Sequence, residues 1–226
     1  MIQNFKLIKK KKLTHNVYEL IFECEHELIM KPWQFITFII NKIWWRAYSI
    51  LELDWKQIKL IIKKRELGEW GRWWSILICN LNIWETLKWV WPAWHFLLQE
   101  NNKNKMFIWT WTGFVPLYNQ IQWNLINKQN CNLEFIFWAR EKTDLFYINE
   151  LMELKLKHKN FNFELFLSRW EVEWINKGYT INYLTKENCE NFEEFYICWA
   201  PAMIESSIEK LKNIWFNDSN IFYEKY

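Results

Sequence analysis

Four short stretches of the chain carry side chains that can bind a phosphate or a flat ring. They are RAYS (46–49), WTWTGFVP (109–116), FWAREKTDL (137–145) and CWAPAM (198–203). In the first, Arg46 can grip a phosphate with two hydrogen bonds, Tyr48 offers a ring for stacking and Ser49 offers a hydroxyl. An ordinary strand of alternating exposure would also explain RAYS, so this stretch alone does not define a site.

The second stretch has the position of a phosphate-binding turn but not the residue types that such a turn needs. KMFI (105–108) reads as a strand and VPLYNQIQ (115–122) as the opening of a helix, which is where a nucleotide phosphate binds. Such a turn needs residues without side chains, so that the backbone can approach the phosphate. Trp109 and Trp111 stand there instead. If these indoles are real, we expect crowding at positions 109, 111 and 199 and a weakened nucleotide site.

Composition suggests an explanation for this conflict. The chain has 19 tryptophans and only 4 glycines. Glycine normally makes up about 7% of a chain, which predicts roughly 16 glycines at this length. The richness in Lys, Asn and Ile is typical of AT-rich coding. We therefore hypothesise that most of the tryptophans are UGA codons that the organism reads as glycine. The alternative is a chain that is truly rich in tryptophan.

Tryptophan also recurs where the backbone favours glycine. Trp33 follows Pro32, Trp84 lies in a turn between apolar runs, and Trp215 falls where a helix ends. Further such positions are Trp91, Trp94, Trp138, at the end of a strand, and Trp199. Core tryptophans would recur with the period of a helix or strand, which these do not.

Two patterns of secondary structure predict two domains. Residues 1–100 read as short strands separated by turns, which suits a small antiparallel Greek-key β-barrel. Residues 101–226 alternate strands with helices, which predicts an α/β domain with a parallel, Rossmann-like sheet. The predicted helices are PLYNQIQWNLI, DLFYINELMELKL and AMIESSIEKLKNI.

Composition argues against several classes of protein. The formal net charge of +3 is too small to indicate nucleic-acid binding, and no apolar run reaches the ~18 residues of a membrane span. The lysines near the N-terminus lack the apolar core of a secretory signal. Five unpatterned cysteines fit reduced thiols in the cytoplasm. His15, His26, His95 and His158 lack ligand spacing, so we expect no metal site.

Together the four stretches resemble the ferredoxin–NADP reductase family of flavoprotein reductases, and the resemblance runs nearly end to end. Their order and the β-then-α/β division both match. Reading Trp as Gly sharpens the match, since GTGTGFVP, CGAPAM and GPAGHFLL are typical of the family. The resemblance implies an FAD-dependent oxidoreductase that uses NADP(H) or NAD(H).

By this resemblance the first domain binds FAD. Arg46 would hold the pyrophosphate, Tyr48 would stack on the isoalloxazine, and Ser49 would lie near the flavin N5. Lys63 belongs to the strand that runs beside the flavin. A second contact is expected in GRWWSIL (71–77), where a helix N-terminus would cradle phosphate with Trp73, Trp74 and Ser75.

The second domain would bind NAD(P), with its pyrophosphate turn at Thr110, Thr112, Gly113 and Pro116. Arg140 and Asp144 follow the next strand, although Asp144 could serve only to cap a helix.

The adenosine end of the dinucleotide is expected at the third strand of this domain. Ser168 and Arg169 match the pair that holds the 2′-phosphate in NADP-using members. This favours NADP, although the pair also occurs in NAD users and Arg169 could be a surface residue. Tyr179 resembles the ring that stacks on adenine.

The catalytic residues implied by the resemblance are Ser49, Cys198 and Glu224. Cys198 matches the family cysteine close to the nicotinamide C4. Glu224 and Tyr226 match a plant-type Glu-x-Tyr ending, whose ring covers the flavin and whose carboxylate serves proton and hydride handling. A buried thiol and a plain terminal strand are the alternative interpretations.

The hypothesis is therefore hydride transfer between NAD(P)H and FAD in the crevice between barrel and sheet. Because no cysteine cluster is present, the one-electron partner would be a separate ferredoxin or flavodoxin-type carrier. An NADH-dependent reductase feeding another acceptor, such as an oxygenase, is one alternative. A non-catalytic binding protein is another, if the tryptophans are literal. The lysine run 9–12 is most simply a solvated hairpin edge, and otherwise a docking patch for an acidic carrier.

Overall fold

The computed structural model describes residues 3–28, 34–40, 44–65, 73–93, 96–110, 113–127, 130–199 and 201–225. The chain forms two compact units. Unit 1 comprises Met1–Leu97 with Tyr118–Gln120, and unit 2 comprises Leu98–Leu117 with Ile121–Tyr226. Several residues singled out in the sequence lie outside the described ranges: Trp33, Trp94, His95, Trp111, Thr112 and Tyr226.

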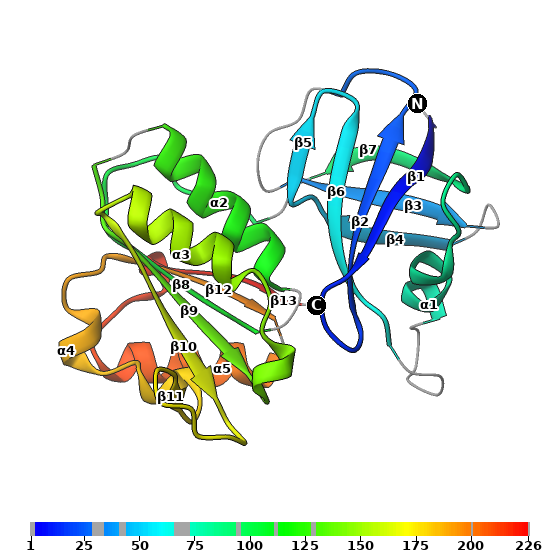
Figure 1. Cartoon of the computed structure of the whole chain (residues 1–226). Coiled ribbons are helices and arrows are strands. Elements are labelled where there is room, and N and C mark those ends of the chain that lie inside the picture. Colours follow the sequence, from blue (N-terminus) through cyan, green and yellow to red (C-terminus); the bar gives the residue numbers. More distant parts are fainter. Residues whose placement is uncertain are drawn as a thin grey trace. The chain divides into compact units, whose positions relative to one another are not determined.

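Unit 1 is built on a seven-stranded antiparallel sheet with the order β4-β3-β7-β1-β2-β6-β5 (Figure 1). Its elements are β1 (Gln3–Lys12), β2 (Val17–Cys24), β3 (Phe35–Ile40), β4 (Trp44–Ser49), β5 (Glu52–Asp54), β6 (Gln57–Lys63), α1 (Trp73–Asn80) and β7 (Thr86–Ala93). β7 pairs with both β1 and β3, so the sheet order departs from the chain order. The predicted antiparallel β-domain is confirmed.

The core of unit 1 follows from period-2 alternation of apolar residues. Phe5, Phe22, Phe38 and Leu60 are fully buried and come from four different strands. In an antiparallel sheet with one covered face, such alternation places every second side chain inside. Lys10, from the lysine run, donates from Nζ to the carbonyl oxygens of Cys79 and Leu81, at 3.3 and 2.7 Å. It therefore caps the carboxyl end of α1, where a cation is favoured.

Unit 2 is built on a six-stranded parallel sheet with the order β11-β10-β9-β8-β12-β13. Its strands are β8 (Lys105–Thr110), β9 (Leu133–Ala139), β10 (Phe161–Leu167), β11 (Asn176–Lys177), β12 (Glu194–Trp199) and β13 (Ile221–Lys225). Its helices are α2 (Phe114–Ile126), α3 (Ile148–Lys157), α4 (Lys186–Cys189) and α5 (Pro201–Asn213). Its 3-10 turns are η2 (Lys142–Asp144), η3 (Thr180–Asn182) and η4 (Asp218–Asn220). The predicted parallel α/β domain is confirmed.

Helices cover both faces of the parallel sheet, with α2 and α3 on one side and α5 on the other (Figure 1). This explains why β9 is buried along nearly its whole length. The helix predicted over 144–156 begins only at Ile148. Residues 142–144 form η2 instead. Tyr147, the residue just before α3, has left-handed backbone angles.

A buried lysine ties the start of unit 2 to its sheet. The Lys105 side chain is fully buried, and its Nζ donates to both oxygens of Asn101 and to the Lys103 carbonyl, at 2.8 to 3.0 Å. Its charge lies 3.7 Å from Glu194 Oε2, and burial lowers its pKa. Glu194 in turn accepts from Asn101 Nδ2 and from the Tyr196 hydroxyl. The polar segment before β8 is therefore fixed to the sheet rather than being a loose tether.

Four described non-glycine residues have positive φ, and three of them are tryptophan. Trp55 (φ 50°) is the first residue of the two-residue loop between β5 and β6, where a hairpin turn requires positive φ. Trp84 (φ 78°) is the third residue of a turn closed by Glu85 N donating to Asn82 O at 3.1 Å. That is the glycine position of a type II turn.

Trp215 (φ 85°) follows the carboxyl end of α5. Phe216 N donates to Leu211 O at 3.1 Å, and Trp215 N donates to Lys212 O at 3.0 Å. This pair of bonds is a Schellman motif, whose left-handed residue is usually glycine.

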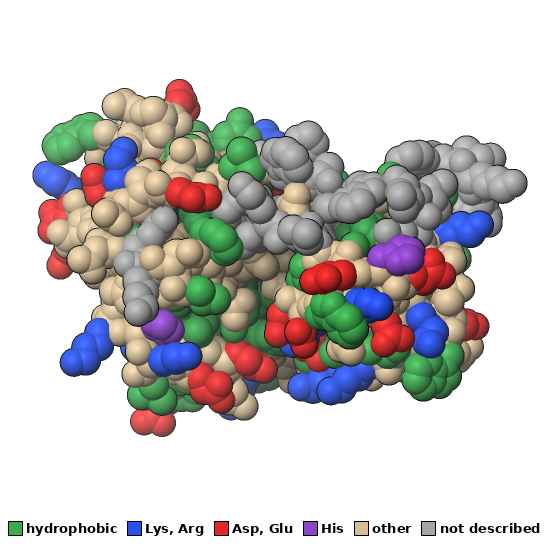
Figure 2. All heavy atoms as spheres, turned by 90° about the horizontal axis from the view of Figure 1, so that it is seen from above, with side chains coloured by type: hydrophobic (Ala, Val, Ile, Leu, Met, Phe, Trp, Pro, Cys, Tyr) green, Lys and Arg blue, Asp and Glu red, His purple; other side chains and the backbone are tan. Residues whose placement is uncertain are grey.

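The charged side chains are well mixed. Figure 2 shows acidic and basic groups interspersed over the visible face, in keeping with the small net charge of the chain. Within the described residues, no helix is both long and apolar enough to cross a membrane.

Candidate functional site

The carboxyl edge of the parallel sheet in unit 2 holds most of the residues predicted to bind a dinucleotide. β8 ends at Thr110, and Gly113 precedes α2. Gly113 has an ordinary φ of −61°, so its backbone angles do not require glycine. Space does, because a Cβ at this position would lie 2.8 Å from the Cys198 carbonyl oxygen and 3.2 Å from its sulfur. Pro116 is buried in the first turn of α2, where its missing N–H costs little.

Cys198 and Glu224 occupy paired positions on β12 and β13. Cys198 is fully buried, and burial raises the pKa of its thiol well above the ordinary value, with a further rise from Glu224. The thiol is therefore protonated and is a packing group rather than a nucleophile at neutral pH. The structure brings together Gly113, Cys198 and Glu224, which are far apart in the sequence.

The ends of β9 and β10 bring together the residues predicted for the adenosine end. Ser168 N donates to Ala139 O at 3.2 Å, and Arg169 N donates to Arg140 O at 3.1 Å. Tyr179 is 55% exposed and stacks on Trp138, with ring centroids 5.5 Å apart. Trp138 is the penultimate residue of β9, one residue before the strand end expected from the sequence.

One charged residue at this edge was not among the predicted site residues. Glu141 Oε1 accepts from Arg169 Nη1 at 3.1 Å, and the two side chains form an ion pair. β9 and β10 pair residues that are 28 positions apart, such as Ala139 with Leu167. Extending that register by two residues places Glu141 opposite Arg169. Only the strand register provides this signal, and the sequence does not show it.

In unit 1, the RAYS residues lie on β4. Arg46 is exposed, whereas Tyr48 packs against the core, with its ring centroid 5.9 Å from that of Phe38. Burial raises the pKa of the Tyr48 phenol; the Arg46 charge opposes this rise, and Cys79 of α1 adds to it. Tyr48 is therefore an uncharged ring that lies near Arg46 and near Cys79 of α1. Ser49 ends β4 and is half-buried.

The predicted phosphate cradle of unit 1 lies at the first turn of α1, which begins at Trp73. The Ser75 hydroxyl accepts a hydrogen bond from Arg65 N at 3.1 Å and so joins α1 to the segment that follows β6. Lys63 is the last residue of β6. The rings of Trp73 and Trp74 have centroids 3.5 Å apart at an angle of 31°. Aromatic pairs ordinarily lie about 4.5–7 Å apart, so these indoles are crowded.

Trp109 does not project into the nucleotide turn, which corrects the expectation that its indole fills the cofactor space. Its ring is fully buried in the core of unit 2, against Phe114, Phe135 and Phe137. The expected crowding is present there, since the Trp109 and Phe137 centroids are 3.8 Å apart. Trp109 Nε1 is buried without a hydrogen-bond partner among the described residues.

Asp144 belongs to the cap of η2, and the N-cap of the helix that follows, α3, is Tyr147, which corrects the capping role considered for Asp144 from the sequence. Its Oδ2 accepts from Glu141 N at 3.2 Å, and the two residues form a capping box around η2. Across the described ranges, no group of three His, Cys, Asp or Glu side chains is arranged to hold a metal ion.

Comparison with known proteins identifies the class of this fold. Residues 107–208 match the oxidoreductase NAD-binding domain. One subunit of the Na⁺-translocating NADH-quinone reductase of Neisseria meningitidis is 28% identical over 145 residues, which cover 60% of this chain and 36% of that protein. The match therefore spans little more than a third of the length of this relative.

Solved structures share the whole two-unit fold. A cytochrome P450 reductase from Amycolatopsis superposes with a TM-score of 0.88 at 17% identity, over 100% of this chain and 69% of that one. A ferredoxin NADP⁺ reductase from Neisseria gonorrhoeae, solved with bound FAD and NADP, gives 0.85 at 17% identity, over 99% and 98% of the two chains. The chain contains an oxidoreductase NAD-binding domain at residues 107–208. Its two-unit fold is that of ferredoxin NADP⁺ reductase structures.

Proposed function

We propose that this chain is a flavin-dependent reductase that passes hydride between NAD(P)H and FAD. The observation that carries the proposal is the contact of Gly113 with Cys198. A bare backbone at the start of α2 lies against the strand end where the family cysteine stands, and even a methyl group would not fit there. The residues present thus suit a dinucleotide on the carboxyl edge of a parallel sheet.

The proposed roles follow the placement of each side chain. Arg46, Tyr48 and Ser49 on β4, Lys63 at the end of β6, and the first turn of α1 with Ser75 would hold FAD. Gly113 and the turn before α2 would hold the pyrophosphate of NAD(P), with Thr110, Thr112, Pro116 and Arg140 beside it. Cys198 would pack against the nicotinamide, and Glu224 with Tyr226 would serve the proton. When bound, the two cofactors supply the hydride chemistry, and the chain supplies position.

For the electron acceptor, we propose a separate one-electron carrier of the ferredoxin or flavodoxin type. A second candidate is a reductase component for another acceptor. It is favoured by the match to a protein of the NADH-quinone reductase. A cytoplasmic location stays a prediction from the reduced cysteines, all of which are buried thiols.

Reconstitution tests the proposed function. The full chain, purified and incubated with FAD, should show a flavin absorbance spectrum and should oxidise NADH or NADPH with ferricyanide as acceptor. Arg46→Ala should weaken FAD binding, whereas Lys9→Ala, at an exposed position on β1, should not. If the full chain stays colourless after incubation with FAD, the proposal is overturned and the non-catalytic binding protein is favoured.

We further propose that the native protein carries glycine at most of the tryptophan positions. Three exposed indoles occupy left-handed turn positions, and two buried indole N–H groups, on Trp109 and Trp138, have no hydrogen-bond partner among the described residues. Left-handed backbone suits glycine, and a buried unsatisfied donor costs about 1–3 kcal/mol. Recoding of UGA accounts for all of these features together.

Peptide mass spectrometry of the protein from its own organism tests the recoding. Peptides that contain residues 55, 84, 109 and 215 should carry the mass of glycine at those positions, and the corresponding codons should be UGA. Tryptophan masses there, or UGG codons, would show that the chain is truly rich in tryptophan.

A further inference from the structure

Arg169 already has a carboxylate partner at the edge where the adenosine end of the dinucleotide is proposed to bind. The Glu141–Arg169 ion pair joins the loops that follow β9 and β10, and both side chains are partly exposed, at 39% and 57%. The backbone of Arg169 is fixed as well, through its N–H bond to Arg140 O at 3.1 Å. The pair is therefore within reach of solvent and of a ligand.

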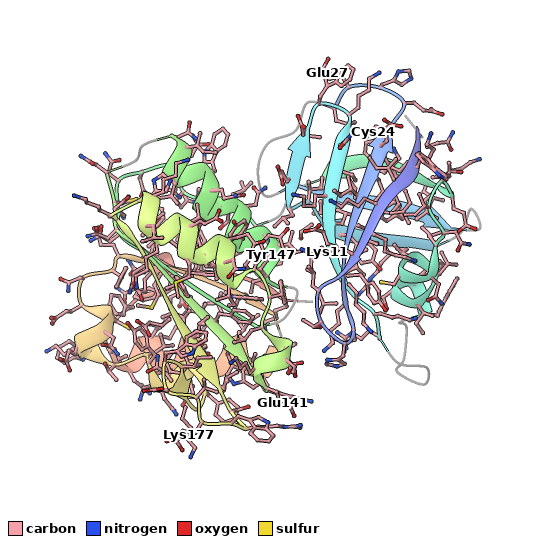
Figure 3. The ribbon with its side chains drawn as sticks, in the orientation of Figure 1. Lys11, Cys24, Glu27, Glu141, Tyr147 and Lys177 are labelled. Carbon is pink, nitrogen blue, oxygen red and sulfur yellow. The ribbon has the colours of Figure 1, made fainter. Side chains whose placement is uncertain are left out.

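The Glu141 side chain is held in place from its own side. Glu141 and Asp144 form the capping box of η2, so the carboxylate belongs to a short ordered turn rather than to a free loop. Figure 3 shows Glu141 on the loop that leaves the sheet after β9, with Lys177 on the neighbouring β11 segment. An acidic group is thus a fixed part of this edge.

A further cation of this edge is paired too. β11 runs beside the end of β10, where Lys177 pairs with Leu167. Lys177 Nζ lies 3.1 Å from Glu171 Oε2. Arg169 and Lys177, two of the cations at this edge, each carry a carboxylate already.

We infer that Glu141 is a specificity-determining residue that makes the chain favour NADH over NADPH; this inference rests on the proposed function. A 2′-phosphate on Arg169 would compete with the carboxylate for the guanidinium and would lie beside the negative charge of Glu141. A ribose 2′-hydroxyl instead donates a hydrogen bond to a carboxylate, as acidic residues accept it in other NAD sites. The inference reverses the preference that the Ser168–Arg169 pair suggested in the sequence.

Nucleotide binding tests the inference without catalysis. The native full chain is titrated with 5′-AMP and with 2′-phospho-AMP, as fragments of NAD and NADP, in wild type and Glu141→Gln. The wild type should bind 5′-AMP the more tightly. In Glu141→Gln the affinity ratio should shift toward 2′-phospho-AMP on the order of 10-fold, because removing one like charge and freeing Arg169 both favour the phosphate. Arg169→Ala on the Glu141→Gln background should abolish the shift.

The matched control is Asp218→Asn, which breaks the exposed pair between Lys212 of α5 and Asp218 of η4. In this variant the affinity ratio of the two nucleotides should equal that of the wild type. The ratio of kcat/KM for NADPH to that for NADH should also be unchanged. An unaltered ratio in Glu141→Gln, or a wild type that already prefers the 2′-phosphate, would overturn the role of Glu141. Failure of both fragments to bind would overturn the proposed function itself, and this inference with it.

Discussion

The backbone conformation of three tryptophans, Trp55, Trp84 and Trp215, indicates positions that suit glycine. All three are exposed, at 64%, 65% and 77%, and all have positive φ. An L-residue in the left-handed region costs roughly 1–2 kcal/mol because its Cβ approaches the following carbonyl oxygen. Tyr147 (φ 61°) is the remaining described residue of this kind, and recoding does not account for it.

Replacing Trp84 by glycine should therefore stabilise a chain produced with tryptophan at every position. The type II turn keeps its backbone and loses the strain, so we expect a gain of roughly 1 kcal/mol in the free energy of unfolding. Urea unfolding measures it. Trp123→Gly, in the interior of α2, is the control and should lose about 1 kcal/mol or more. Destabilisation by Trp84→Gly would contradict the glycine assignment at this turn.

Glu134 links a single carboxyl group to the pH dependence of stability. Burial raises its pKa to about 7, although Asn162 Nδ2 donates to both of its oxygens. Its unfolded pKa is near 4.5. Between these values the unfolded chain loses a proton that the folded chain keeps. Stability from this group is thus complete below about pH 4.5 and falls as the pH rises toward 7.

Glu134→Gln removes that titration and keeps an acceptor for Asn162. The stability of the wild type relative to this variant should fall by up to about 3 kcal/mol between pH 4.5 and pH 7.5. Chemical unfolding at several pH values measures the difference, in which other titrating groups cancel. A difference that is constant with pH would show that the folded carboxyl group titrates normally.

At the scale of elements, strand register decides which charges meet. β9 and β10 are neighbours in register, and this alone brings Glu141 to Arg169 across 28 residues of sequence. In the same way, β8 and β12 place Lys105 opposite Glu194 at the start of both strands. The Lys105 network therefore holds the entry segment of unit 2 to two strands at once.

Lys105→Met should cost about 3–5 kcal/mol in the stability of unit 2, because it leaves Glu194 buried without its cation. Replacing both residues, in Lys105→Met with Glu194→Leu, should cost less than the sum of the single changes. A double-mutant cycle by urea unfolding measures this coupling. Additive effects would mean that the two charges do not stabilise one another. Exposed Lys212→Met, in another ion pair, should cost no more than about 1 kcal/mol.

At the scale of the whole molecule, the candidate flavin residues and most of the candidate dinucleotide residues belong to different units. A change in one unit should therefore affect one cofactor. Gly113→Ala should leave the FAD content unchanged and raise the KM for NAD(P)H on the order of 10- to 100-fold, because the new Cβ would displace the Cys198 backbone. Flavin absorbance and steady-state kinetics measure the two effects. Ser206→Ala, on the exposed side of α5, is the control. Loss of FAD in Gly113→Ala would contradict this separation.

The predicted fold class is confirmed, and the NAD-binding domain agrees with the predicted family, because both predictions rest on local signals. Alternation of period 2 marks the strands of unit 1, and the strand–helix alternation after residue 100 marks the parallel sheet. The helix start at residue 144 was wrong, because a left-handed Tyr147 separates η2 from α3 and nothing in DLFY indicates it. The functional roles of the individual site residues stay predictions.

The sequence by itself determined the order of strands and helices, the turn positions that suit glycine and the motifs of the family, since each depends on residues close together along the chain. Only the tertiary structure decided that Trp109 lies in the core, that Lys105 is buried and that Arg169 is held by Glu141. Such contacts depend on which strands are neighbours and in which register, and that is set by packing of the whole sheet rather than by local preference.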